Sequence, residues 1–269
     1  MAMEAEARTA GLLWSELRSL AHGLAEHEWD KATPCARWTV KDLLAHVTGL
    51  QTAMDGTAEQ PPAPEGWSPQ AEGLSGLDAW TELGVVARRN WSRERLLEEL
   101  EVAAAGHVAR FAAGDPGDDA IGPFGPTTLE RLHGFRMFDL WVHLQDFHLA
   151  LGRPLDLGAQ APGGADACRH VFRGLPALAV KRAGLGDGDR LRVRVEEPAA
   201  IDAALVVEGG RAAWDPGAEA ADAVEAKPGV LALLLAGRGT PEEWRAEGGL
   251  DWRGTLGEAF VQRARVFGA

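Results

Sequence analysis

Two residues of types that commonly bind metals lie four positions apart in an apolar segment. Asp139 and His143 belong to residues 129–151, which are rich in Leu, Phe, Met, Trp and Val and predict one long helix. At about 100° per residue, both side chains fall on one helix face, and Arg136 and Asp146 lie on the same side within about 60°. A helix this apolar is usually buried, and a buried carboxylate or imidazole must be paired or bound to a metal. The spacing therefore indicates a hydrogen-bonded structural pair or two ligands of a divalent metal.

A third candidate ligand lies far earlier in the chain. His46 belongs to a second predicted helix, which begins at Thr39. Catalytic zinc sites use three protein ligands and leave one position open. His46, Asp139 and His143 would supply such a set from two helices. Asp42 also lies one turn from His46, but its place in a Thr39-x-x-Asp42 capping box predicts a structural role.

The other histidines and the first cysteine carry weaker signals. His148 would project about 180° away from Asp139, and His107 and His133 are expected to be surface or capping residues. Cys35 precedes a helix N-terminus, which can lower the pKa of a thiol. Because no His–Asp arrangement is tied to Cys35 in the sequence, we expect no catalytic role for it.

Composition limits the class of protein. The chain has 269 residues, is 46% hydrophobic and carries a formal net charge of −13, which argues against nucleic-acid and anionic-membrane partners. The N-terminus lacks the pattern of a signal peptide, and the longest apolar run, residues 230–236, is too short to span a bilayer. Two cysteines make no disulfide framework. We expect a cytoplasmic monomer or small homo-oligomer that acts on a small molecule, and scarce lysine beside abundant Arg, Ala and Gly suggests an actinobacterial source.

Up to about residue 183 the hydrophobic periodicity predicts helices. An amphipathic first helix is marked by leucines at positions 13, 17, 20 and 24. Further helices are expected at residues 77–90, 92–113, 129–151 and 165–183. The Pro- and Gly-rich segments 57–76 and 114–126 are expected to be loops. The helix at 129–151 should begin at a Thr127-x-x-Glu130 capping box and end at Gly152. Helices of these lengths suit a bundle.

The pattern changes at Gly184. Strands are expected at residues 191–195, 204–207, 211–214 and 221–226, the middle two forming a hairpin around Gly209-Gly210. Helices should follow from Pro228 and over residues 256–266. The sequence therefore predicts a mixed fold, with a helical bundle in residues 1–183 and a small α+β domain in residues 184–269.

At its candidate metal ligands the chain resembles the mycothiol-dependent maleylpyruvate isomerase family. The matching stretches are Thr33-Pro34-Cys35, Trp38 to His46, Arg136 to Asp146 and Leu151-Gly152-Arg153-Pro154. The resemblance implies a DinB-like metal-binding bundle followed by a sterol-carrier-like α+β domain. It also implies that His46, Asp139 and His143 bind zinc, with mycothiol as the thiol cosubstrate. The family pattern has Glu where this chain has Asp139, a carboxylate shorter by one methylene, so the metal would sit differently.

One arginine also falls at a family-like position. Arg238 ends the Leu-rich helix that follows Pro228. A cation there stabilises the helix dipole, or it faces an anionic substrate as a catalytic-site residue.

The resemblance implies a metal-dependent enzyme that activates a low-molecular-weight thiol. A thiol bound to zinc is deprotonated, and the thiolate is the nucleophile. Addition to a conjugated double bond, rotation and expulsion of the thiol would make the protein a cis–trans isomerase, whereas a lasting adduct would make it an S-transferase. Two alternatives stay open: a thiol-independent metal enzyme of natural-product metabolism, and a non-catalytic small-molecule binding or resistance protein.

Overall fold

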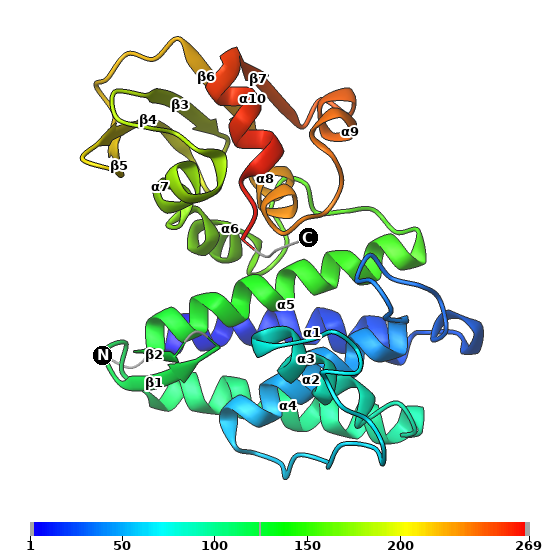
Figure 1. Ribbon diagram of the computed structural model, residues 1–269. Helices are drawn as coiled ribbons and strands as arrows, with labels where there is room; N and C mark the ends of the chain where they lie inside the picture. The colour runs from blue at the N-terminus through cyan, green and yellow to red at the C-terminus, as the bar shows by residue number, and fades with distance from the viewer. Residues whose placement is uncertain (1–2, 124, 267–269) are drawn as a thin grey trace. The chain divides into compact units, whose positions relative to one another are not determined.

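The computed structural model describes residues 3–123 and 125–266 (Figure 1). The chain divides into two compact units, Met1–Leu155 and Asp156–Ala269. Among the described residues, no helix combines the length and apolar character needed to cross a membrane.

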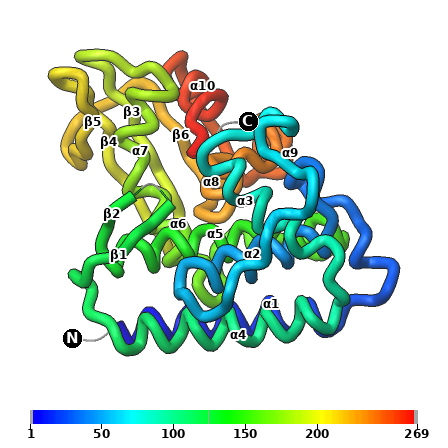
Figure 2. The backbone as a smooth tube through the Cα atoms, turned by 60° about the horizontal axis from the view of Figure 1, so that its bottom comes forward, coloured from blue at the N-terminus to red at the C-terminus, as the bar shows by residue number. Residues whose placement is uncertain are grey.

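The first unit is helical. Its helices are α1 (Glu4–His22), the short 3-10 turn η1 (Glu26–Glu28), α2 (Val40–Asp55), α3 (Gly76–Val86), α4 (Arg93–Ala113) and α5 (Leu129–Leu151). Helix α4 packs against α1 and α2, α3 packs against α2, and α5 contacts α1 and α2. Figure 2 shows α1 and α4 side by side along their lengths. The helical expectation for this part of the chain is confirmed.

Helix α5 forms the buried centre of this unit. Every residue of it from Arg136 to Phe147 is buried, as expected for a helix that is apolar around most of its circumference. The Thr128 hydroxyl caps it by accepting from the backbone N–H of Arg131, and Gly152 ends it with a φ of 66°. The predicted capping box at Thr127 is wrong by one residue, because Thr127 still pairs with Ala120 in a hairpin.

That hairpin lies in the segment expected to be a loop. Strands β1 (Asp119–Gly122) and β2 (Gly125–Thr128) pair antiparallel. Helix α5 contacts both strands. The Pro- and Gly-rich composition does not predict these strands. They form because the two segments pair through backbone hydrogen bonds.

The turn before α2 positions the residues at the start of that helix. The predicted capping box is confirmed: Thr39 accepts from the N–H of Asp42, and the Asp42 carboxylate accepts from the N–H of Thr39. Ala32 and Thr39 form an isolated antiparallel bridge. The intervening turn is closed by Arg37 at a φ of 73°, so the chain folds back over the start of α2.

The second unit is a small α+β module. Its strands are β3 (Arg190–Val195), β4 (Ile201–Glu208), β5 (Arg211–Asp215), β6 (Asp222–Ala226) and β7 (Leu250–Arg253), in the sheet order β5-β4-β3-β6-β7. Strand β3 pairs antiparallel with β4 and parallel with β6. Its helical segments are α6 (Gly164–Phe172), α7 (Leu175–Leu178), the π-helical turn η2 (Ala179–Ala183), α8 (Pro228–Leu235), α9 (Pro241–Ala246) and α10 (Gly254–Arg263). The expected strands and hairpin are confirmed, whereas α9 and β7 were not predicted.

The sheet has one covered face. Along β3, Leu191, Val193 and Val195 are buried, while Arg192 and Arg194 alternate with them. Helices α7 and α10 contact the sheet, and Figure 1 shows α10 running across β6 and β7. Every residue of α8 is buried, as expected for a helix that is apolar all round.

Residues 156–183 differ most from the sequence-based expectation. One helix was predicted over 165–183, but α6 ends at Phe172, and α7 and η2 follow as separate short pieces. Helix α6 packs against α8, and η2 packs against α10. The contacts therefore group residues 156–183 with the second unit, whereas the expected boundary lay at residue 184.

Candidate metal centre

The three residues singled out in the sequence converge in the first unit. His46 on α2 and Asp139 and His143 on α5 each offer a ligand atom, and these atoms lie within 4.8 Å of one another. Nε2 of His46 lies 3.9 Å from Oδ1 of Asp139, and Nε2 of His143 lies 3.6 Å from the same oxygen. Tetrahedral bonds of about 2.0–2.2 Å separate ligand atoms by roughly 3.3–3.6 Å. The three side chains therefore fit around one ion after small adjustments.

Arg136 holds the other oxygen of Asp139. Its NH1 donates to Oδ2 of Asp139 at 2.7 Å, and its Nε donates to Oε1 of Gln51 at 2.9 Å. Burial would raise the pKa of Asp139, but the guanidinium of Arg136 and the imidazole of His143 hold it well below its usual value. Asp139 is thus an anion that presents Oδ1 alone to the two histidines.

The ring of His143 is oriented by a second carboxylate. Its Nδ1 lies 2.9 Å from Oδ2 of Asp146, a residue with no exposed surface. With Nδ1–H donating to Asp146, Nε2 faces Asp139, and a metal there would replace the Nε2 proton, the arrangement typical of metal-binding histidines. Burial would lower the pKa of His143, but the carboxylates of Asp139 and Asp146 outweigh this and raise it well above its usual value. The site therefore attracts positive charge.

His46 differs from His143 in its electrostatics. Burial is the largest influence on His46 and lowers its pKa, so the imidazole is neutral, which is the form that binds metals. Its ring lies 4.7 Å from the ring of Trp38, whose Nε1 donates to Oε2 of Glu82 on α3 at 2.8 Å. Trp38 thus covers His46 and links the site to α3.

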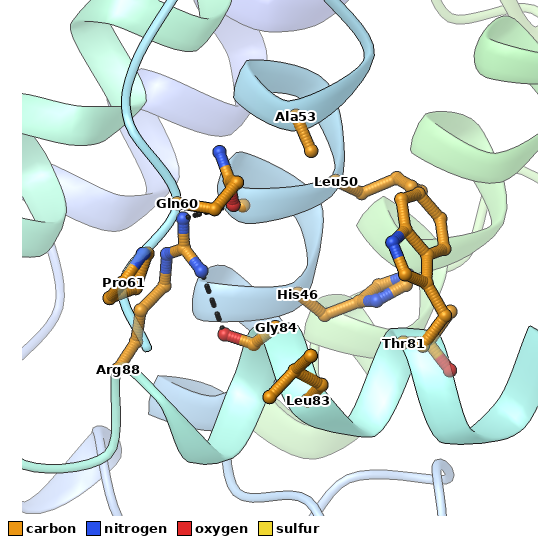
Figure 3. Close-up of a pocket in the computed structure, with 11 residues that line it drawn as sticks. His46, Leu50, Ala53, Gln60, Pro61, Thr81, Leu83, Gly84 and Arg88 are labelled. Carbon is orange, nitrogen blue, oxygen red and sulfur yellow. Dashed lines mark hydrogen bonds between the residues drawn. The ribbon is translucent and has the colours of Figure 1, made fainter. Parts of the chain in front are cut away.

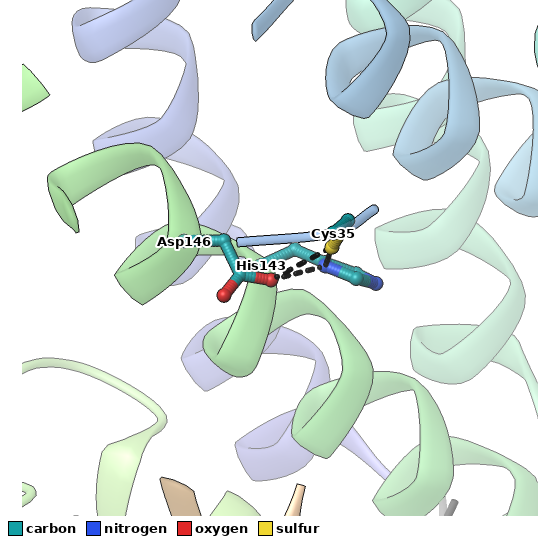
Figure 4. A group of neighbouring side chains, drawn as sticks. All are labelled: Cys35, His143 and Asp146. Atoms are coloured by element: carbon teal, nitrogen blue, oxygen red, sulfur yellow. Dashed lines mark hydrogen bonds and ion pairs between the residues drawn. The ribbon is translucent and has the colours of Figure 1, made fainter. Parts of the chain in front are cut away.

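Cys35 lies at this site, contrary to the sequence-based expectation. Its Sγ lies 3.3 Å from Oδ2 of Asp146 and 3.9 Å from Nδ1 of His143 (Figure 4). Cys35, His143 and Asp146 form a second group with metal-binding geometry, on the opposite ring nitrogen of His143. The expectation that no His–Asp arrangement accompanies Cys35 is wrong. The predicted placement of Asp146 on the same helix side as Asp139 was the one signal that pointed toward this group.

A hollow adjoins the site on the side of His46. Its enclosed volume is about 70 Å³, and the space including its open mouth is about 430 Å³. Its lining residues are His46, Gly49, Leu50, Ala53, Gln60, Pro61, Trp80, Thr81, Leu83, Gly84 and Arg88 (Figure 3). They come from α2, α3, the segment between these helices and the turn after α3. The hollow is therefore built within the first unit.

Two other histidines are buried, which corrects a second expectation. His107 has no exposed surface and His133 is 5% exposed, although both were expected at the surface or in caps. Nδ1 of His107 accepts from Nε1 of Trp14 at 3.0 Å, a bond that offsets part of the cost of burial. His148, by contrast, points away from His46, Asp139 and His143, as predicted, since its Nδ1 lies 2.8 Å from the carbonyl oxygen of Pro154.

Arg238 lies in the second unit, directly after α8. Its NH1 donates to the carbonyl of Ala236 at 2.6 Å. This contact with the last turn accords with a dipole-stabilising position.

Comparison with known proteins bears on the whole chain. The family model described as the mycothiol maleylpyruvate isomerase N-terminal domain matches residues 10–148. No curated protein matches. Among solved structures, the crystal structures of the mycothiol-dependent maleylpyruvate isomerase and of a histidine-to-alanine mutant of it each match with a TM-score of 0.57 and 18% identity, covering 94% of this chain and 93% of that chain. At this identity the likeness concerns the fold, and it extends over both units.

Proposed function

Because the chain belongs to the mycothiol maleylpyruvate isomerase N-terminal domain family, we propose that it is a zinc enzyme that uses mycothiol to attack a small electrophilic substrate. His46, Asp139 and His143 would hold the metal. The observation that carries the proposal is the convergence of these three side chains within 4.8 Å. Two imidazoles and one carboxylate form a donor set that suits zinc and leaves a position open.

Bound zinc would supply one chemical step, the deprotonation of a coordinated thiol to its nucleophilic thiolate. The chain's own residues prepare for it. Asp139 contributes the negative charge, Arg136 fixes which of its oxygens faces the histidines, and Asp146 sets the orientation of His143. Trp38 packs against His46 and limits the access of water to that ring.

The proposed reaction begins with addition of the thiolate to an electrophilic carbon. With a conjugated cis alkene, the S–C bond forms while the π electrons move to the conjugated carbonyl as an enolate. Rotation about the resulting single bond and expulsion of the thiolate give the trans alkene and restore the thiol, which is isomerisation. With an adduct that takes up a proton and leaves, the thiol is consumed and the enzyme is an S-transferase.

Elemental analysis of purified variants tests the metal site. We expect about one zinc per chain in the parent, and loss of zinc in His46→Ala and His143→Ala. His148→Ala is the matched control, because His148 lies on the same helix but faces Pro154. Stoichiometric zinc in both of the first two variants would contradict the assignment.

Cobalt substitution tests the use of thiol. Mycothiol added to the cobalt form should produce intense thiolate-to-metal absorption in the near ultraviolet, since sulfur would enter the open position. If mycothiol leaves the cobalt spectrum unchanged, a thiol-independent metal enzyme replaces the proposal. If the parent binds no metal at all, a non-catalytic small-molecule binding protein replaces it.

A further inference from the structure

The hollow beside His46 is lined mainly by apolar surface. Leu50 and Ala53 come from α2, and Trp80 and Leu83 come from α3, with Pro61 between the helices. Trp80 is 42% exposed, an unusual fraction for so large an apolar side chain. An apolar wall of this kind is typical of small-molecule sites, whose volumes run from about 300 to about 1,000 Å³. The enclosed part of the hollow measures about 70 Å³ and can hold only part of a ligand, and the open mouth brings the total space to about 430 Å³.

The charged residue that lines the hollow is already neutralised. Arg88 donates from Nε and NH2 to the buried carboxylate of Glu99, at 2.8 and 2.7 Å. Its NH1 donates to the carbonyl of Gly84 at 2.9 Å, and NH2 also donates to Oε1 of Gln60 at 3.0 Å (Figure 3). All three guanidinium nitrogens therefore have partners within the protein. The charge of Arg88 is balanced by the carboxylate of Glu99, so it supplies little counter-charge to a ligand.

The other polar side chains of the lining are satisfied in the same way. Nε2 of Gln60 donates to Oγ1 of Thr52 and to the carbonyl of Ala58. Oγ1 of Thr81 donates to the carbonyl of Asp78. A ligand carboxylate entering this hollow would lose its hydration and gain little counter-charge from the described lining residues, which is strongly unfavourable.

The hollow has open space next to Gly84. A Cβ added at Gly84 would meet no heavy atom within 4 Å, apart from its chain neighbours and the backbone of its own helix. At Gly49, by contrast, an added Cβ would lie 2.7 Å from Cζ of Arg88. Gly49 therefore makes room for the arginine, whereas Gly84 borders space that a ligand can fill.

From these observations we infer that the hollow receives the end of a neutral, apolar group of the substrate, such as the edge of an aromatic ring or the end of an alkyl chain. The substrate class is then an uncharged electrophile with an apolar arm, such as an unsaturated ester or ketone. This differs from maleylpyruvate, the dicarboxylate in the name of the related enzymes. The inference rests on the proposed function only in taking the site beside His46 as the place of reaction.

Methyl cinnamate and cinnamate form a matched pair of probes for this inference. Both carry the same aromatic ring and conjugated alkene, and only cinnamate carries a charge. Dissociation constants are measured by ligand-detected nuclear magnetic resonance, on the full chain freed of zinc and without thiol, so that the cinnamate carboxylate cannot coordinate the metal. We expect the ester to bind at least about 10-fold more tightly than the acid, because burying an unpaired carboxylate costs more than about 1.4 kcal/mol.

Variants at Gly84 locate the bound ester. Gly84→Leu fills the open space and should weaken binding of methyl cinnamate by about 10-fold or more, since the ring and the new side chain compete for one volume. Gly84→Ala is the matched control, because its single methyl group leaves most of the hollow open. Circular dichroism and zinc content check that both variants are folded and freed of zinc.

Two results overturn the inference: cinnamate binding as tightly as its ester in the parent, or ester binding that is equal in Gly84→Leu and Gly84→Ala. The probe comparison in the parent does not depend on any variant folding. Repeating it on protein loaded with zinc separates the two proposals, because only the metal can then add affinity for the cinnamate carboxylate. Ester binding that persists without zinc supports the hollow even where the metal or thiol tests fail, and loss of zinc in His46→Ala supports the metal centre even where the probes fail.

Discussion

The guanidinium of Arg136 donates to Oδ2 of Asp139 at 2.7 Å, one helical turn away on α5. Because Oδ2 is engaged, Asp139 presents only Oδ1 to His46 and His143. Gln51 accepts from Nε of Arg136 and so fixes the guanidinium in turn. The shorter carboxylate of this chain is therefore held with one oxygen, Oδ1, available to bind a metal.

We predict that Arg136→Met weakens zinc binding by about 10- to 100-fold, the usual effect of removing a group that orients a metal ligand. Without the guanidinium, Asp139 also loses the charge that keeps its pKa low. Competition with a chromophoric chelator measures the dissociation constant. Arg131→Met removes an exposed arginine from the same helix and should leave the constant unchanged. Equal zinc affinity in both variants would contradict the role given to Arg136.

Two substitutions of Asp139 test separately whether the charge and the length of its side chain matter for zinc binding. Asp139→Glu should keep zinc and bind mycothiol at least as well as the parent, because the negative charge remains and one oxygen can still reach the metal. Asp139→Asn keeps the shape but loses the charge, and should weaken zinc binding by more than about 100-fold, beyond the typical effect of an orienting group. Zinc titrations and the mycothiol-induced absorption of the cobalt forms measure both effects. Similar zinc affinity in the Asn and Glu variants would show that Asp139 is not a ligand.

A Cys35 variant tests which of the two groups of potential metal ligands binds the metal. Cys35→Ser should retain about one zinc per chain, because we assign the metal to His46, Asp139 and His143 and not to the group of Cys35, His143 and Asp146. A serine hydroxyl can still donate to Asp146, so the orientation of His143 is preserved. Elemental analysis of Cys35→Ser and His46→Ala in parallel gives the comparison. Zinc lost from the serine variant and kept in the alanine variant would reverse the assignment.

Burial of His107 predicts a pH dependence of stability. Burial, aided by the nearby charge of Arg136, lowers the pKa of His107 well below 6.5. Below pH 6.5 the unfolded chain therefore binds a proton that the folded chain does not, and the stability falls as the pH falls. One such proton changes the free energy of unfolding by about 1.4 kcal/mol per pH unit.

His107→Gln isolates this contribution, because glutamine can still accept from Trp14 but does not titrate. Between about pH 7.5 and about pH 5.5, the parent should lose about 1 kcal/mol more unfolding free energy than the variant. Urea denaturation at both pH values measures the difference. A difference between parent and variant that stays constant with pH would show that His107 takes up a proton as readily in the folded protein as in the unfolded chain.

The sequence alone determined the features that depend on local geometry. Asp139 and His143 meet because an α-helix repeats every 3.6 residues, whatever packs around it. The Thr39 cap and the strand from 191 to 195 followed in the same way, from hydrogen bonds or alternation within a few residues. His46 was a candidate third ligand by its residue type, but only the family resemblance linked it to Asp139 and His143, since nothing in its own segment points to α5.

Only the tertiary structure decided the contacts between residues far apart in the chain. Cys35 and Asp146 are 111 positions apart, and His107 and its partner Trp14 are 93 positions apart. Local pattern cannot show either contact. His107 follows a stretch of α4 rich in charged residues, so its segment resembles a solvent-facing helix, yet α1 covers it and supplies the donor that makes its burial tolerable. Residues 156–183 join the second unit for the same reason: their helical pattern resembled the bundle, but their apolar side chains are buried against α8 and α10, which only folding brings to them.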